Sequence, residues 1–67
     1  MDNDWILIYE TNKEFESEII RGMLAEHEIE AFIINKQDSA YLFGNFELYV
    51  MRNDVMKAKT LILNLNL

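Results

Sequence analysis

The sequence contains no cysteine, and this absence excludes several kinds of chemistry. Without a thiol, the chain can form no disulfide, present no cysteine nucleophile and offer no thiolate ligand to a metal. Proteins of the cytoplasm rarely carry disulfides, so the composition agrees with the cytoplasmic location that we expect. The chain begins with the acidic stretch M-D-N-D, whereas a secretory signal peptide begins with basic residues, and we therefore expect no export.

Glycine and proline are also scarce. Proline is absent and glycine occurs only at Gly22 and Gly44, so the sequence has no glycine-rich loop of the kind that holds nucleotide phosphates. No linker, repeat or low-complexity segment divides the 67 residues, which predicts a single α+β domain over 1–67. The unbroken apolar runs are only a few residues long, so we expect no membrane-spanning segment.

Basic residues are few, because six lysines and arginines stand against twelve aspartates and glutamates, for a net charge of −6. Such a surface repels the phosphate backbone of a nucleic acid. Only Lys57 and Lys59 lie close together among the basic residues. We therefore expect no nucleic-acid partner, and an acidic surface that keeps the protein in solution.

The hydrophobic pattern changes its period along the chain. Apolar residues run together or alternate at 5–9, 29–35 and 46–51, as they do in β-strands. They recur with helical spacing at 12–27 and 53–64. The pattern therefore predicts the order strand, helix, strand, strand, helix.

The first expected helix carries an apolar stripe at every third or fourth position. The stripe consists of Phe15, Ile19, Ile20, Met23 and Leu24. Thr11 and Glu14 precede it with the spacing of a capping box, which satisfies free N–H groups at a helix start. Asn53 is a favourable first cap for the second helix.

Two positions leave alternatives open. Gly22 lies inside the first expected helix, where glycine costs roughly 1 kcal/mol relative to alanine, and close packing against the sheet is one reason for keeping it. Near the C-terminal end, Leu63, Leu65 and Leu67 alternate with asparagines as they would in a strand. A fraying helix end is favoured over a strand because no turn signal separates the two patterns.

These elements fit one simple architecture. A strand–helix–strand unit crosses over in the right-handed sense, and the third strand then inserts antiparallel between the first two. We predict a two-layer βαββα sandwich with strand order 1-3-2 and both helices on one face. This is a ferredoxin-like plait that lacks its last strand.

The sheet face away from the helices is expected to be apolar and aromatic. It would carry Trp5, Leu7, Tyr9, Phe32, Ile34, Tyr49 and Met51. A face this apolar and aromatic is unfavourable to leave in water, and these residue types are enriched at interfaces. The chain is also short, and its first strand forms an unguarded sheet edge.

We therefore expect a homo-oligomer, most simply a dimer. The expected interface consists of Trp5, Leu7, Tyr9, Phe32 and Tyr49. The other interpretation is that these side chains are singly half-exposed, which is ordinary for surface hydrophobic residues.

Candidate catalytic and metal-binding residues are few. His27 is the only histidine, and with no serine or cysteine beside it in sequence we expect a surface residue at a helix end. Glu26, Glu28 and Glu30 flank it, but they straddle a helix end and a strand and lack a recognised ligand spacing. We expect no metal, no cofactor and no enzymatic activity.

One loop gathers mixed hydrogen-bonding groups and is the candidate site for a small ligand or a protein partner. It consists of Asn35, Lys36, Gln37, Asp38, Ser39 and Tyr41. Loops of this composition often bind ligands because a rigid scaffold positions them. The alternative is ordinary turn chemistry, which also requires polar residues.

Several segments together are similar to a known family. They are Trp5 at the start of the first strand, Leu24 late in the first helix, the stretches I-E-A-F-I-I-N, N-K-Q-D-S-A-Y and G-N-F-E-L-Y-V, and an acidic cap before an alanine-containing helix. Over nearly the whole chain they resemble the domain-of-unknown-function family described as putative prokaryotic signal-transducing proteins. The resemblance implies a small bacterial protein with a ferredoxin-like or PII-like plait.

In PII-type regulators the loop between strands two and three is the signalling loop, and residues 36–44 would be its counterpart here. This chain has a far shorter loop, a missing or rudimentary last strand, and no nucleotide-binding set of glycines and basic residues. The resemblance therefore implies neither ATP binding nor uridylylation of Tyr41. We expect a non-enzymatic regulatory or signal-transducing binding module; the alternative is a structural interaction module that acts through its aromatic sheet face.

Overall fold

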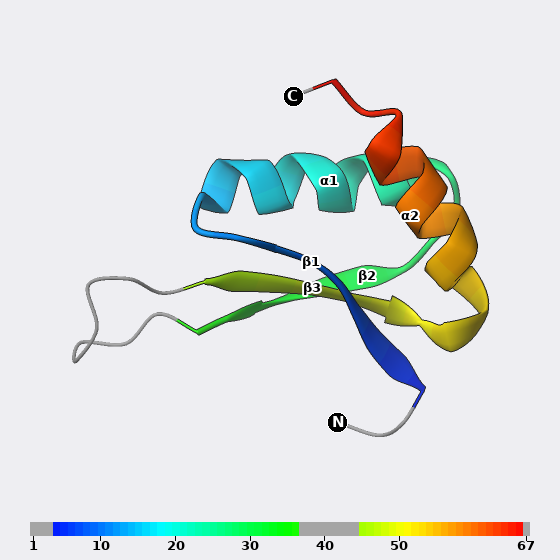
Figure 1. The fold of residues 1–67 in the computed structure, drawn as a ribbon, viewed down its shortest axis with the longest axis horizontal. Helices are drawn as coiled ribbons and strands as arrows, with labels where there is room; N and C mark the ends of the chain where they lie inside the picture. Colours follow the sequence, from blue (N-terminus) through cyan, green and yellow to red (C-terminus); the bar gives the residue numbers. More distant parts are fainter. Residues whose placement is uncertain (1–3, 37–44, 67) are drawn as a thin grey trace.

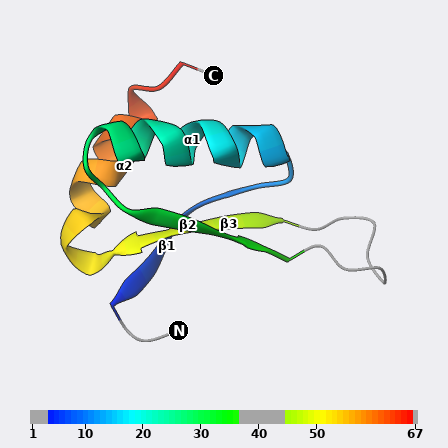
Figure 2. The same cartoon turned by 180° about the vertical axis from the view of Figure 1, so that it is seen from behind.

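The computed structural model describes residues 4–36 and 45–66. Its elements are β1 (Trp5–Thr11), α1 (Glu14–Glu26), β2 (Ala31–Asn35), β3 (Phe46–Met51), the short 3₁₀ helix η1 (Arg52–Asp54) and α2 (Val55–Leu63). Both helices lie on the same side of the sheet, as the two opposite views in Figures 1 and 2 show. The predicted α+β class and the predicted element order are confirmed.

The sheet has the predicted order β1-β3-β2, and both neighbours of β3 run antiparallel to it. The strand β3 is central, and its successive side chains point to opposite faces of the sheet. Phe46, Leu48 and Val50 are buried on the side of the helices, while the residues between them are only half-buried. The arrangement is a ferredoxin-like plait without its last strand, as predicted.

The core lies between the sheet and the helices. Its fully buried hydrophobic members come from α1, β3, α2 and the connection after α1. They are Ile20, Leu24, Ile29, Leu48, Val50 and Ala58. Burial of a valine, leucine or isoleucine side chain contributes roughly 1.5–3 kcal/mol, so this cluster is the main source of stability.

The start of α1 differs from the predicted capping box. The helix begins at Glu14 with Lys13 as its first cap, and no side chain bonds to the cap. Thr11 is instead the last residue of β1, and its hydroxyl oxygen accepts a hydrogen bond of 3.1 Å from the Lys13 N–H. The prediction was wrong because Thr11 belongs to the strand, so its hydroxyl orders the turn before the helix.

The buried face of α1 is also rotated from the predicted stripe. Ser17, Ile20 and Leu24 are buried, whereas Ile19 is exposed and Phe15 is 62% exposed. Burial of Ser17 is tolerated because its hydroxyl donates a 2.7 Å hydrogen bond to the Glu14 carbonyl oxygen. The buried face of α1 therefore includes a small serine whose hydroxyl is satisfied within the helix, whereas the hydrophobic pattern had placed only larger apolar side chains there.

The end of α1 is fixed by a left-handed residue. Glu28 has a φ of 63°, and its N–H donates to the carbonyl of Ala25 at 3.0 Å. The Ile29 N–H donates to the carbonyl of Leu24 at 2.9 Å. These two bonds form a Schellman motif, and they bring Ile29 into the core beside Leu24, so β2 begins at Ala31 rather than at residue 29.

The C-terminal helix begins and ends inside its predicted range of 53–64. Asn53, the predicted first cap, lies in η1, and Asp54 precedes α2 without a side-chain bond to the helix. The helix ends at Leu63, and residues 65 and 66 belong to neither a helix nor a strand. Leu65 packs against the core, while Leu67 lies outside the described residues.

Gly22 is not explained by close packing. It is exposed on α1, and a Cβ atom added there would meet nothing within 4 Å. The interpretation that glycine lets the helix approach the sheet is therefore wrong. The residue keeps the conformational freedom of glycine in the unfolded chain without a compensating contact in the folded one.

We expect Gly22→Ala to raise the free energy of unfolding by about 0.5–1 kcal/mol, because alanine loses less backbone entropy on folding. The reverse change at a matched exposed position of the same helix, Ala25→Gly, should lower it by a similar amount. Urea denaturation followed by circular dichroism measures both. An unchanged or lower stability of Gly22→Ala would contradict the open environment of this position.

Candidate functional site

The sheet face away from the helices, here called the open face, is the candidate site. The register of the three strands gives its members. They are Trp5, Leu7, Glu10, Phe32, Ile34, Glu47, Tyr49 and Met51. Within residues 4–36 and 45–66, no helix or strand packs over this face.

Three aromatic rings gather on the open face. The ring centroids of Trp5 and Phe32 are 4.5 Å apart in an edge-to-face arrangement, and those of Phe32 and Tyr49 are 6.0 Å apart and stacked. Because the rings cover one another, all three side chains are half-buried rather than fully exposed. Leu7 is exposed beside them. The placement of these four predicted residues on one face is therefore as the sequence indicated.

Tyr9 does not belong to the open face, and this prediction is wrong. The pairing register shifts between Leu7 and Tyr9, so that Ile8 is an extra residue in β1. Beyond this β-bulge, Tyr9 stands opposite the buried Leu48, on the side of the helices. Its hydroxyl donates a 2.8 Å hydrogen bond to Glu16 on α1.

Two carboxylates occupy the other end of the open face. Glu10 and Glu47 are directly opposite each other on β1 and β3. Asn45 donates a 2.8 Å hydrogen bond from Nδ2 to Glu10 Oε2, and the Tyr49 hydroxyl donates one of 2.9 Å to Glu47 Oε1. Like charges directly opposite on a sheet repel, and both donors are neutral, so this end of the face carries concentrated negative charge.

Sequence reasoning missed this acidic end for two reasons. The alternation of β3 had placed Glu47 on the same side as Tyr49, but the predicted interface included only aromatic and apolar residues of that side. Glu10 reaches the open face only because the bulge at Ile8 reverses the alternation after it. No residue type in the strand signals that bulge.

The predicted binding loop adjoins the open face at its base. The Lys36 N–H donates to the Asn45 carbonyl at 2.9 Å, and Lys36 Nζ lies 3.9 Å from Glu47 Oε1. Asn35 is exposed and stands opposite Phe46, on the side of the helices. The remaining predicted loop residues lie outside the described residues. They are Gln37, Asp38, Ser39 and Tyr41.

His27 lies at the end of α1, where the sequence placed it. It is exposed, and its Nδ1 is 3.0 Å from the Met23 carbonyl oxygen. In the described part of the chain, no three histidine, aspartate or glutamate side chains are placed to hold a metal ion together. Neither α1 nor α2 has the length and apolarity that a bilayer-crossing helix requires.

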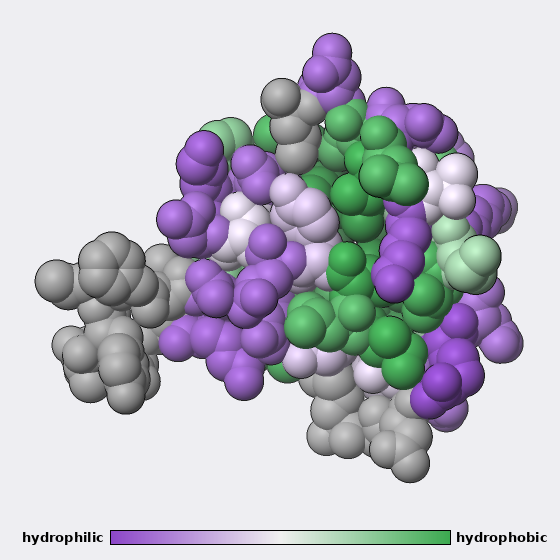
Figure 3. Space-filling model, in the orientation of Figure 1, coloured by the Kyte–Doolittle hydropathy of each residue, from purple (hydrophilic) through white to green (hydrophobic). Residues whose placement is uncertain are grey.

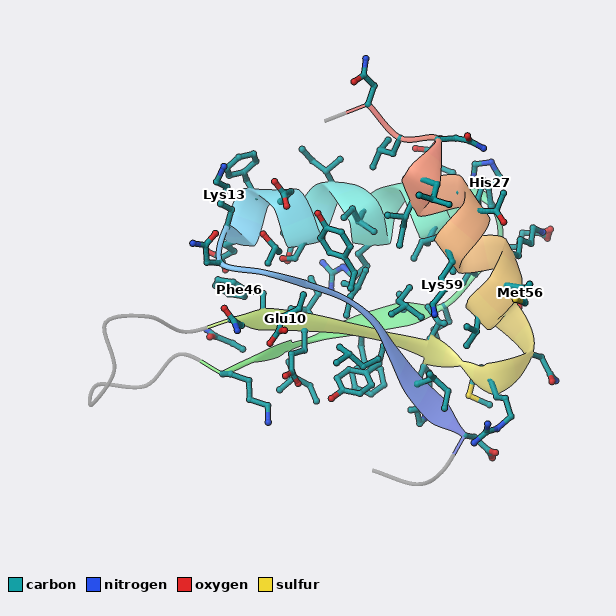
Figure 4. All side chains as sticks on the ribbon, in the orientation of Figure 1. Glu10, Lys13, His27, Phe46, Met56 and Lys59 are labelled. Carbon is teal, nitrogen blue, oxygen red and sulfur yellow. The ribbon has the colours of Figure 1, made fainter. Side chains whose placement is uncertain are left out.

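An apolar groove runs between the outer edge of β1 and α2. It has a volume of about 350 Å³ and is lined by Ile8, Tyr9, Lys59, Ile62 and Leu63. Figure 3 shows hydrophobic side chains gathered on this side of the molecule, and Figure 4 shows Lys59 reaching from α2 toward β1. The groove is separate from the open face, because Ile8 and Tyr9 turn away from that face.

Comparison with known families identifies the family of this chain. A family model described as "Putative prokaryotic signal transducing protein" matches residues 5–66. The chain belongs to this family. No curated protein and no solved structure matches it. The predicted family membership is confirmed, and the match runs from β1 to beyond the end of α2.

In this member of the family, the surroundings of Tyr49 on the open face shift the pKa of its phenol. The pKa of Tyr49 is raised above 10.0, first because its hydroxyl donates to the Glu47 carboxylate, then through burial, and then through the negative charges of Glu47 and Glu10. A raised pKa means that folding favours the protonated phenol. Its contribution to stability is complete below pH 10 and is lost as the pH rises through the folded-state pKa.

We expect Tyr49 to ionise above its ordinary pKa of 10.0, and Glu47→Gln to bring the pKa back toward that value. The ¹³Cζ chemical shift of labelled tyrosine, followed from neutral to alkaline pH, measures each phenol separately. Glu18→Gln, which removes an exposed carboxylate from α1, is the matched control and should leave Tyr49 unchanged. A Tyr49 pKa that does not respond to Glu47→Gln would contradict the hydrogen bond.

Proposed function

We propose that this chain is a non-enzymatic, signal-transducing module of the cytoplasm that binds a partner protein on its open face. The observation that carries the proposal is the cluster of Trp5, Phe32 and Tyr49 on a face that no described helix covers. Tryptophan and tyrosine are enriched among the residues that dominate binding energy at interfaces. The family description supports a role in signalling.

A binding role fits the geometry of this face better than catalysis does. The open face is the surface of a three-stranded sheet. Its two carboxylates accept hydrogen bonds from neutral donors, and Lys36 Nζ lies 3.9 Å from Glu47 Oε1, beyond hydrogen-bond distance. His27, the only histidine, is bonded to the helix end on the other layer. Rings fixed by mutual packing on a sheet offer a surface for recognition, since little side-chain entropy remains to be lost.

Lys36, which follows β2, lies beside this proposed surface. Its nearest carboxylate there is that of Glu47 on the open face. We therefore include the predicted loop residues in the binding surface. They are Asn35, Lys36, Gln37, Asp38, Ser39 and Tyr41.

Capture of partners from a bacterial lysate tests the proposal with a matched pair of variants. Immobilised wild type, Trp5→Glu and Phe15→Glu are compared by quantitative mass spectrometry. Both changes replace an aromatic ring with a carboxylate, but Phe15 is 62% exposed on α1, on the other layer. We expect specific partners to be retained by Phe15→Glu and reduced by about tenfold or more with Trp5→Glu, since a central aromatic contact dominates such interfaces.

Circular dichroism must show that both variants are folded. Equal capture by all three baits would contradict a role for the open face. Asp38→Ala, which leaves the contact between Lys36 and Glu47 in place, then separates the contributions of the two surfaces: loss of capture with unchanged stability assigns binding to the loop.

We propose self-association as a second candidate function, because β1 offers an edge and a groove to a second copy. Within the described chain β1 pairs only with β3, and its residues 5–9 carry no charge. The adjoining groove is apolar except for Lys59. The charge of −6 on each copy opposes association, but it is screened beyond about 10 Å at ordinary salt.

Sedimentation equilibrium tests this candidate. The wild type should have twice the chain mass of 8.0 kDa, and Leu63→Glu should be monomeric, because it places a charge on the rim of the groove. Met56→Glu is the matched control: both side chains are largely exposed, at 85% and 79%, and Figure 4 shows Met56 on the outer side of α2. A monomeric wild type, or dissociation by both variants, would contradict association through the groove.

A further inference from the structure

The open face joins an aromatic half to an acidic half, and Tyr49 belongs to both. Its ring stacks on Phe32, while its hydroxyl bonds to Glu47. Glu10 stands opposite Glu47, and its charge also acts on the Tyr49 phenol. A ligand lying across Tyr49 would therefore contact ring surface and carboxylates at the same time.

The carboxylates of this face retain capacity for a further donor. Each ionised carboxylate offers about four acceptor positions, and the structure shows one neutral hydrogen bond to Glu10 and one to Glu47. The side chain of Glu47 is only 14% exposed, so its charge acts in a partly desolvated setting. Two like charges on directly opposed residues are favourable to an incoming cation and unfavourable to an anion.

Lys36 is a weak internal counter-ion of this pair. Its Nζ lies 3.9 Å from Glu47 Oε1, beyond hydrogen-bond distance, and its side chain is 57% exposed. Because the lysine is exposed and the distance is long, Lys36 is held loosely and can be replaced by another cation. Lys36 therefore lies beside the acidic end of the face but leaves its carboxylates able to bind another cation.

We infer that the open face recognises a basic segment of a partner protein. An arginine of that segment would contact the ring of Tyr49 and the two carboxylates, and apolar side chains next to that arginine would contact Trp5 and Phe32. This inference rests on the proposed function and names the chemistry of its partner. The planar guanidinium of arginine both stacks on an aromatic ring and donates paired hydrogen bonds to carboxylates, which an ammonium group cannot do. The net charge of −6 attracts such a segment during encounter.

A short capped peptide of alternating leucine and arginine is the probe. It is titrated into ¹⁵N-labelled protein, and the amide shifts of the open face are followed by NMR. We expect binding that weakens as salt is added, and a citrulline peptide of the same length, which keeps the shape but loses the charge, should bind about tenfold more weakly. A lysine peptide should fall between the two.

Charge-matched variants separate the open face from the general acidity of the chain. Glu10→Gln with Glu47→Gln should weaken arginine-peptide binding by about tenfold. Glu14→Gln with Glu26→Gln makes the same change in net charge at exposed positions of α1 and should weaken it by less than about twofold. Lys36→Ala should tighten binding severalfold by removing the internal competitor, whereas the charge-matched Lys57→Ala on α2 should not.

The outcomes distinguish this inference from the proposed function. Equal binding of the citrulline and arginine peptides overturns it, and so does an equal loss in the two glutamate double variants. The absence of open-face shifts with the arginine peptide up to about 1 mM, the weakest affinity expected of a specific contact, overturns it as well. The proposed function is tested independently, because the capture experiment with Trp5→Glu and Phe15→Glu makes no assumption about the charge of the partner.

Discussion

The extra residue at Ile8 determines which side chains of β1 reach each layer of this protein. Before it, Trp5 and Leu7 lie on the open face; after it, Tyr9 turns toward the helices and Glu10 takes a place on the open face. A strand without the bulge would put Tyr9 on the outer surface and would leave α1 without its bond from Tyr9 to Glu16. One inserted residue thus places Tyr9 against the helices and Glu10 on the open face, because the side-chain alternation of a strand reverses at a bulge.

The sequence was sufficient to predict the fold, since its strongest signals are long-range and redundant. The strict alternation of β3 predicted a strand with one buried face, the crossover of the strand–helix–strand unit predicted its central place, and the helical spacing of apolar residues predicted both helices. The details that were wrong are all one-residue effects. The bulge at Ile8 is a local shift of strand pairing, and the left-handed Glu28 and the buried Ser17 are accompanied by local hydrogen bonds; hydrophobicity encodes none of the three.

The candidate site was predictable only in its apolar part. Regular alternation along the three strands places Trp5, Phe32 and Tyr49 on the same face of the sheet. The structure adds that their rings pack into one cluster. The acidic part required the register of β1 against β3, because Glu10 lies beyond the bulge. Lys36 was identified in the sequence as a loop cation, but its position beside Glu47 follows from the hairpin geometry that pairs it with Asn45.

The only tryptophan of the chain lies in this face, and that has a practical consequence for studying the protein. The ring of Trp5 is packed edge-on against Phe32 and is half-buried. Its indole emission therefore arises entirely from one region, with no second tryptophan to dilute it. The native protein carries its own optical reporter at the surface where a partner would make contact, and changes in solvent access there can be followed without attaching a dye.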